Sequence, residues 1–187
     1  MRLENYKAKV LQCIEEIDEK QLDAIVDTIH ETYVNKRTVY IIGNGGSAAT
    51  ASHLALHLRK GFGSQTDNKG MPAHSLAENA PLITALGNDI GYDEIFHAQL
   101  QPILIKGDLI IIISGSGNSA NLTKVIDLAR SRQAAIIGLL GFGGGKLKTL
   151  CDSSIIFSVS DYGPVEDAHL SLSHIIPRLL RERIKDE

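Results

Sequence analysis

Two short segments of this sequence combine glycine with serine in a way that suits an anionic ligand. The first covers residues 43–47 and reads GNGGS, and the second covers residues 114–119 and reads SGSGNS. Glycine lets the backbone approach a ligand closely, while Ser114, Ser116 and Ser119 place three hydroxyl donors within six residues. A phosphate group has several acceptor oxygens, so both segments are candidate phosphate-binding loops.

Each segment alone also fits an ordinary tight turn, in which a serine such as Ser119 caps the helix that follows. The phosphate loop of nucleoside triphosphatases is excluded because no Gly-Lys-Ser or Gly-Lys-Thr follows either segment, and neither carries the dinucleotide-binding fingerprint in the right place. Two serine-containing turns in one small chain nevertheless favour phosphate binding over the plain turn.

The strands and helices predicted around the two segments place both segments between a strand and a helix. Apolar, strand-forming runs over residues 38–42 and 109–113 come directly before them, and helix-forming stretches come after them. An unbroken aliphatic run is typical of a strand that is covered on both faces of a parallel sheet. Ligands bind beyond the carboxyl ends of such strands, where the next helix directs free N–H groups and the positive end of its dipole toward an anion.

The rest of the chain alternates strands with helices. The predicted elements are strands at 73–76, 134–140 and 155–159, and helices at 48–60, 82–86, 92–105 and 165–184. A polar loop is predicted over residues 61–68, and apolar residues recur at helical spacing in the first 35 residues. The alternation predicts an α/β sandwich, and no linker divides the chain. We therefore expect one domain over residues 1–187, including an N-terminal helical arm at 1–36.

Charge and composition narrow the class of protein. The 187 residues carry a net charge of −3 without a cluster of lysine and arginine, so we expect no nucleic-acid partner. The longest apolar runs are far shorter than the roughly 20 residues that span a bilayer, and we expect no membrane association and no signal peptide. Cys13 and Cys151 form no disulfide framework and suit free thiols of a reducing compartment, which predicts a cytoplasmic protein.

Four motifs occur in an order that resembles the sugar isomerase (SIS) domain family. They are residues 43–47 with His53 after them, residues 87–89 (GND), residues 114–119 and residues 143–146 (GGGK). Within that family the likeness is to the phosphoheptose isomerases, which interconvert sedoheptulose 7-phosphate and an aldoheptose 7-phosphate, and it covers nearly the whole chain. The resemblance implies a three-layer sandwich around a five-stranded parallel sheet, and a homotetramer with active sites at subunit interfaces.

The same resemblance implies which residues hold the substrate. The phosphorylated sugar would bind the serines of both loops, with an asparagine and an aspartate near the sugar: Ser47, Ser114, Ser116, Ser119, Asn44 and Asp89. Gly115 departs from the threonine often found at that position of the family, so one hydroxyl donor is missing. Asp161 and Tyr162 could close over a sugar from in front of the last helix, although a plain loop is the simpler interpretation.

The resemblance also implies a zinc site between two helices. In the family, one helix carries a histidine and, four residues on, a glutamate that is also the base. The last helix carries a glutamine and, eight residues on, a histidine that serves as ligand and acid. Here the first pair is His53 and His57, and the second pair is Glu166 and His174. Glutamate has become histidine on one helix, and glutamine has become glutamate on the other.

These four residues still suit a metal ion by their chemistry. His53 and His57 are four residues apart and share one helix face, while Glu166 and His174 point about 80° apart, near enough to converge. Three imidazoles and one carboxylate are a suitable tetrahedral set for zinc. Each residue alone is more simply structural, but the four together favour one divalent metal ion, with zinc as the first choice.

Aldose–ketose isomerisation defines the roles that these residues would take. A base moves a proton between C1 and C2 through an enediolate, and an acid or a metal ion polarises the carbonyl group. We expect Glu166 to be the base and His174 the acid, with His57 as the base instead if Glu166 is held as a ligand. The predicted reaction converts sedoheptulose 7-phosphate to D-glycero-D-manno-heptose 7-phosphate. The alternatives are an isomerase of another sugar, a phosphosugar sensor, and a protein-binding protein like the partner of the bacterial replication initiator.

Overall fold

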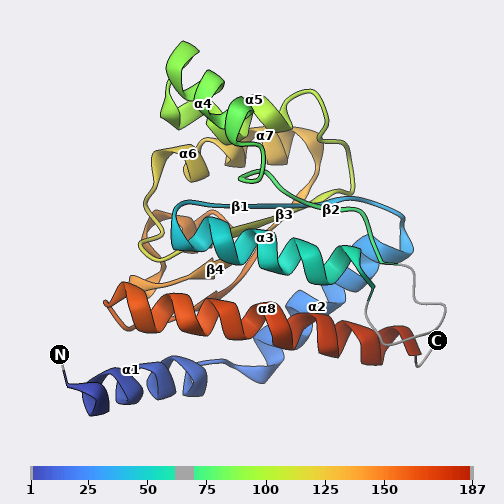
Figure 1. The fold of residues 1–187 in the computed structure, drawn as a ribbon. Helices are drawn as coiled ribbons and strands as arrows, with labels where there is room; N and C mark the ends of the chain where they lie inside the picture. The colour runs from blue at the N-terminus through green and yellow to red at the C-terminus, as the bar shows by residue number, and fades with distance from the viewer. Residues whose placement is uncertain (1, 62–69, 186–187) are drawn as a thin grey trace.

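Five parallel strands form the central sheet in the order β2-β1-β3-β4-β5 (Figure 1). They are β1 (Val39–Gly43), β2 (Ala73–Ser75), β3 (Leu109–Ser114), β4 (Ala135–Leu140) and β5 (Ser153–Ile156). The computed structural model of the chain describes residues 2–61 and 70–185, so the loop predicted over 61–68 lies, apart from Gly61, outside the described residues. The predicted α/β class and its five-stranded parallel sheet are confirmed.

Helices cover both faces of this sheet and complete the expected three-layer sandwich. On one face lie α2, α3 and α8, with α1 packed on α8, and on the other face lie α5, α6 and α7, with α4 outside them (Figure 1). None of the helices within the described ranges is both long and apolar enough to cross a bilayer. The helical elements are α1 (Leu3–Glu15), α2 (Glu19–Val34), α3 (Gly46–Arg59), α4 (Ala80–Asp89), η1 (Tyr92–Glu94), α5 (Ile95–Leu100), α6 (Ala120–Thr123), α7 (Val125–Arg132), η2 (Phe142–Thr149) and α8 (Tyr162–Lys185).

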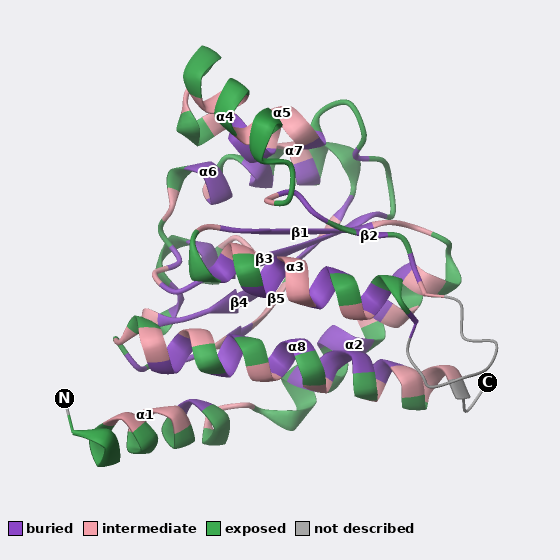
Figure 2. Cartoon of the chain, in the orientation of Figure 1, coloured by how far each residue is buried: buried purple, intermediate pink, exposed green. Residues whose placement is uncertain are grey.

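The aliphatic strands explain why both faces are covered. Every residue of β3 is buried, and Figure 2 shows the strands buried along most of their length. Side chains alternate between the faces, so Ile111 packs in one core with Leu54 of α3 and Leu172 of α8, whereas Ile112 packs in the other core with Phe96 of α5. A polar residue in place of Ile111 or Ile112 would therefore be buried among apolar side chains.

The register of the sheet brings the two serine loops to the same place. β1 and β3 are neighbours, and Gly43 at the end of β1 pairs with Ile113 near the end of β3. Both loops therefore leave the sheet at its carboxyl edge, side by side, as the sequence predicts.

Most element boundaries differ from the sequence prediction by one to three residues, and three of the differences matter here. The last strand covers residues 153–156 and not 155–159, because the chain leaves the sheet edge while its side chains are still apolar. The helix predicted over 92–105 is divided into η1 and α5. The last helix begins at Tyr162 and not at residue 165, which places Tyr162 on the helix and not in the preceding loop.

His169 is a buried titratable residue of α8. Its side chain is fully buried, and its ring centroid lies 5.4 Å from that of Phe157. Burial lowers the pKa of His169 from 6.5 to about 4. The folded chain therefore keeps this imidazole neutral at pH values where the unfolded chain already binds a proton.

This burial predicts a loss of stability on acidification. Between pH 6.5 and about pH 4 the unfolded chain binds more protons at His169 than the folded chain, so the free energy of unfolding falls as the pH falls. His169 should contribute about 2 kcal/mol to that fall between pH 7 and pH 5. Urea unfolding of the wild type and of His169→Leu at both pH values measures it, with the exposed His74→Gln as control. An equal pH dependence in all three proteins would contradict the prediction.

Candidate active site

The two serine loops form one pocket at the carboxyl ends of β1 and β3. The pocket encloses about 150 Å³ and is lined from both loops and from the starts of α3, α6 and α8 by Asn44, Ser47, Ile113, Ser114, Gly115, Ser116, Ser119, Leu122, Tyr162 and Glu166. Five of the six predicted substrate residues are in this lining. The structure therefore brings together the hydroxyl groups that suit a phosphate, and it adds one carboxylate, that of Glu166.

Hydrogen bonds fix the shape of the second loop. The Gly117 N–H donates to Ser114 Oγ at 3.0 Å within the loop. The motif at residues 143–146 supports the loop from its neighbouring strand, since the Lys146 N–H donates to Asn118 Oδ1 at 3.0 Å. The loop therefore has its shape before any ligand binds, and its hydroxyl groups are oriented in advance.

Asn44 of the first loop is held by residues that sequence reasoning missed. Its side-chain amide exchanges two hydrogen bonds with the amide of Asn121, at 2.9 and 2.8 Å. The Tyr92 hydroxyl donates to Asn44 Oδ1 at 3.0 Å. Asn121 and Tyr92 are positioning residues for Asn44, and the one available signal for them was the polar Asn121 on the buried side of α6.

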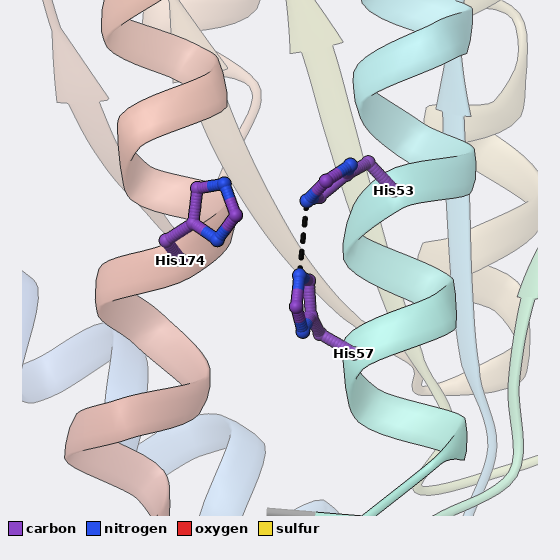
Figure 3. A group of neighbouring side chains, drawn as sticks. All are labelled: His53, His57 and His174. Atoms are coloured by element: carbon purple, nitrogen blue, oxygen red, sulfur yellow. Dashed lines mark hydrogen bonds between the residues drawn. The ribbon is translucent and has the colours of Figure 1, made fainter.

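Three of the predicted metal ligands meet between α3 and α8. His53 and His57 of α3 face His174 of α8, and their ligand nitrogens all lie within 4.8 Å of one another (Figure 3). The Nε2 atoms of His53 and His57 are 2.9 Å apart. The ring centroid of His174 is 4.7 Å from that of His53 and 5.1 Å from that of His57. The i, i+4 spacing on α3 therefore has the effect that the sequence predicts.

This histidine group fits a divalent metal ion. Burial, with a smaller effect of nearby cationic groups, lowers the pKa of both His53 and His57 and so favours the neutral imidazole. Neutral imidazole is the form that ligates zinc, and three histidines leave a fourth position open, as catalytic zinc sites do. If a zinc ion binds here, it supplies a Lewis acid for a substrate carbonyl.

Glu166 lies in the pocket and not in the histidine group. Among the described residues, the group that could hold a metal ion consists of the three histidines. The Glu166 carboxylate lies over the first turn of α3, where a methyl group on Gly46 would overlap it. α3 and α8 run in the same direction (Figure 1), and the eight residues from Glu166 to His174 separate them by about 12 Å along the axis. The angle of about 80° does not include this axial distance, and the prediction that Glu166 is a fourth metal ligand rests on the sequence alone.

Asp89 is the one predicted substrate residue that does not line this pocket, as far as the described residues show. It ends α4, its side chain is exposed, and it accepts a hydrogen bond from Asn88 Nδ2 at 2.9 Å. Any contact of Asp89 with a sugar would therefore have to be made outside the pocket of its own chain.

The fold and the site together define the class of this protein. The SIS domain family matches the chain over residues 4–141, and the chain belongs to that family. Within it, the chain groups with the phosphoheptose isomerases. The phosphoheptose isomerase of Aliarcobacter butzleri is 36% identical over 173 residues, which cover 92% of this chain and 88% of that protein. That of Trichlorobacter lovleyi is 37% identical over 158 residues, which cover 84% of this chain and 80% of that protein.

A solved structure agrees with this grouping. The phosphoheptose isomerase of Neisseria gonorrhoeae superposes on the chain with a TM-score of 0.87 at 26% identity, over 96% of both chains. The resemblance that the four motifs carry is thereby confirmed along nearly the whole chain.

Proposed function

We propose that this chain is a phosphoheptose isomerase that converts sedoheptulose 7-phosphate to D-glycero-D-manno-heptose 7-phosphate. The observation that carries the proposal is the pocket in which the serines of both loops meet the carboxylate of Glu166. A group that holds phosphate and a group that can move a proton are the two requirements of a sugar-phosphate isomerase. Relatives named phosphoheptose isomerase, matched over most of their length, support the choice of substrate.

In this proposal the serine hydroxyls of the pocket bind the substrate phosphate, and Asn44 binds the sugar. Glu166 is the base that takes the proton at C1 or C2 and returns it to the other carbon. A histidine that ligates a metal ion has donated its lone pair, so His57 cannot also accept this proton while it is a ligand. None of the hydrogen bonds of the described residues engages the Glu166 carboxylate, so its oxygens can accept the substrate proton. His174 is the acid, through its second ring nitrogen.

We propose that His53, His57 and His174 hold one divalent metal ion, with zinc as the first choice. Purification without chelators should give about one metal ion per chain, and chelation should abolish turnover of sedoheptulose 7-phosphate until zinc is returned. Elemental analysis and a coupled isomerase assay measure the two quantities. The His174→Ala variant should lose the metal ion, and His74→Ala, outside the group, should keep it. Bound sugar phosphate without metal or turnover would contradict the isomerase and favour the non-catalytic phosphosugar-binding alternative.

We further propose a homotetramer with active sites at subunit interfaces. α4 supports an interface, because its composition is apolar while none of its residues is buried (Figure 2). Leu82 of α4 and Ile90 just after it are exposed, as are Leu3 and Leu11 of α1, and a second subunit would remove this apolar surface from water. Asp89 would then meet the sugar in a neighbouring subunit's pocket.

The domain organisation and the location are proposals of the same kind. We infer that residues 1–187 form one SIS domain with its N-terminal arm, since α1 packs on α8 and α2 packs on the sheet layer. A cytoplasmic location is supported by Cys13 and Cys151, which are both free thiols.

A further inference from the structure

Tyr162 lies at the mouth of the serine pocket. It is the first residue of α8, it lines the pocket beside Ser114 and Ser116, and 55% of its surface is exposed. Its position on the helix directs the side chain back over the second loop.

The ring of Tyr162 packs on the backbone of that loop at Gly115. A methyl group on Gly115 would lie 2.8 Å from both Cδ1 and Cε1 of the ring, closer than real carbon contacts. The ring of Phe142 lies beside it, with 4.6 Å between the ring centroids. Glycine at position 115 therefore provides the space that the tyrosine ring occupies, and Phe142 limits its movement.

The backbone that carries Tyr162 is fixed by α1. Lys9 Nζ donates to Asp161 Oδ2 at 2.8 Å on one side of it. On the other side, a methyl group on Gly163 would lie 3.1 Å from the Tyr6 ring, so α1 packs closely there as well. The ring is therefore held by its neighbours and by the backbone beneath it.

The hydroxyl group of Tyr162, by contrast, is left available. None of the hydrogen bonds formed among the described residues uses it, although the loop beside it presents serine hydroxyls to the same cavity. A phenol hydroxyl donates readily to an anionic oxygen, and such a bond is stronger than one between neutral groups.

We infer that Tyr162 is a substrate-binding residue that closes the phosphate site and donates its hydroxyl to a phosphate oxygen, next to Gly115, where the loop itself has no side chain. The inference rests on the proposed sugar-phosphate substrate. The Tyr162 ring forms one apolar side of the pocket, and its hydroxyl group is a hydrogen-bond donor that comes from α8 and not from the loop.

The test compares Tyr162→Phe with the wild type. Loss of one hydrogen bond to a charged group should raise both KM and the dissociation constant of sedoheptulose 7-phosphate about tenfold, while kcat changes less than twofold. Steady-state kinetics and calorimetry measure these values. The control is Tyr33→Phe, a tyrosine at the far end of α2 beside Pro72, which should match the wild type.

A double-mutant cycle tests the packing on Gly115. Gly115→Ala should raise KM in the presence of Tyr162, because the ring must move, and should have less effect in a Tyr162→Ala background. A Tyr162→Phe enzyme with wild-type KM and dissociation constant would overturn the inference and leave the proposed function intact. A wild-type chain that neither binds nor converts the sugar phosphate would overturn both.

Discussion

Exchanging Glu166 for glutamine should lower kcat for sedoheptulose 7-phosphate by a factor of about 10² to 10⁴, while the metal content stays at the wild-type level. Glutamine keeps the size and the polarity of the side chain but cannot accept the substrate proton. The metal content should not change because Glu166 lines the serine pocket, whereas the three histidines form the metal group. Turnover and elemental analysis of the same preparation separate the two roles.

His57→Gln is the matched comparison. It removes an imidazole from the histidine group and should lower the metal content together with kcat. A second variant adds His57→Glu to Glu166→Gln, which moves the carboxylate from α8 to α3, the arrangement that the family resemblance implies. Part of the lost kcat should return in that double variant. If Glu166→Gln instead loses the metal ion, Glu166 is a fourth ligand, and if it keeps full turnover, the base lies elsewhere.

The fold could be predicted from the sequence because each strand and helix is indicated by a short run of neighbouring residues. The aliphatic run over residues 109–113 is unbroken and buried, and β3 ends at Ser114, directly before Gly115. β5 was misplaced because the apolar residues Phe157 and Val159 are buried after the strand has ended, so burial alone could not mark its end. An edge strand has one neighbour, and its length depends on that neighbour more than on its own sequence.

The site was predictable where helix periodicity or the carboxyl edge of the sheet places its residues. The pair His53 and His57 depends on helix periodicity alone, and the structure keeps both side chains together. The position of Glu166 depends on how α8 packs along α3. The support of Asn44 by Asn121 depends on contact between the first loop and α6. Such contacts are set by the packing of the whole chain, and a single sequence carries no direct signal for them.

Contacts between distant segments also hold the second serine loop. There Gly117 packs against the glycine segment at residues 143–145. Gly117 is buried and has a φ of +65°, a left-handed conformation that residues other than glycine adopt at a cost. A methyl group on Gly117 would overlap the carbonyl oxygen of Gly144 and lie 3.0 Å from the nitrogen of Gly145. The loop that carries the serines is therefore held in place by a backbone contact that leaves no room for a side chain.

Gly117→Ala should consequently lower the free energy of unfolding by about 4 kcal/mol, from backbone strain and overpacking together, and lower the melting temperature by about 10 °C. Gly143→Ala is the matched control. Its φ of +74° imposes similar strain, but none of the residues that the structure describes lies within 4 Å of an added methyl group, so about 1 kcal/mol is expected. Chemical unfolding gives both values, and calorimetry should show weakened sugar-phosphate binding in Gly117→Ala alone. Equal losses in the two variants would mean that backbone strain, and not the contact with Gly144, makes glycine necessary at position 117.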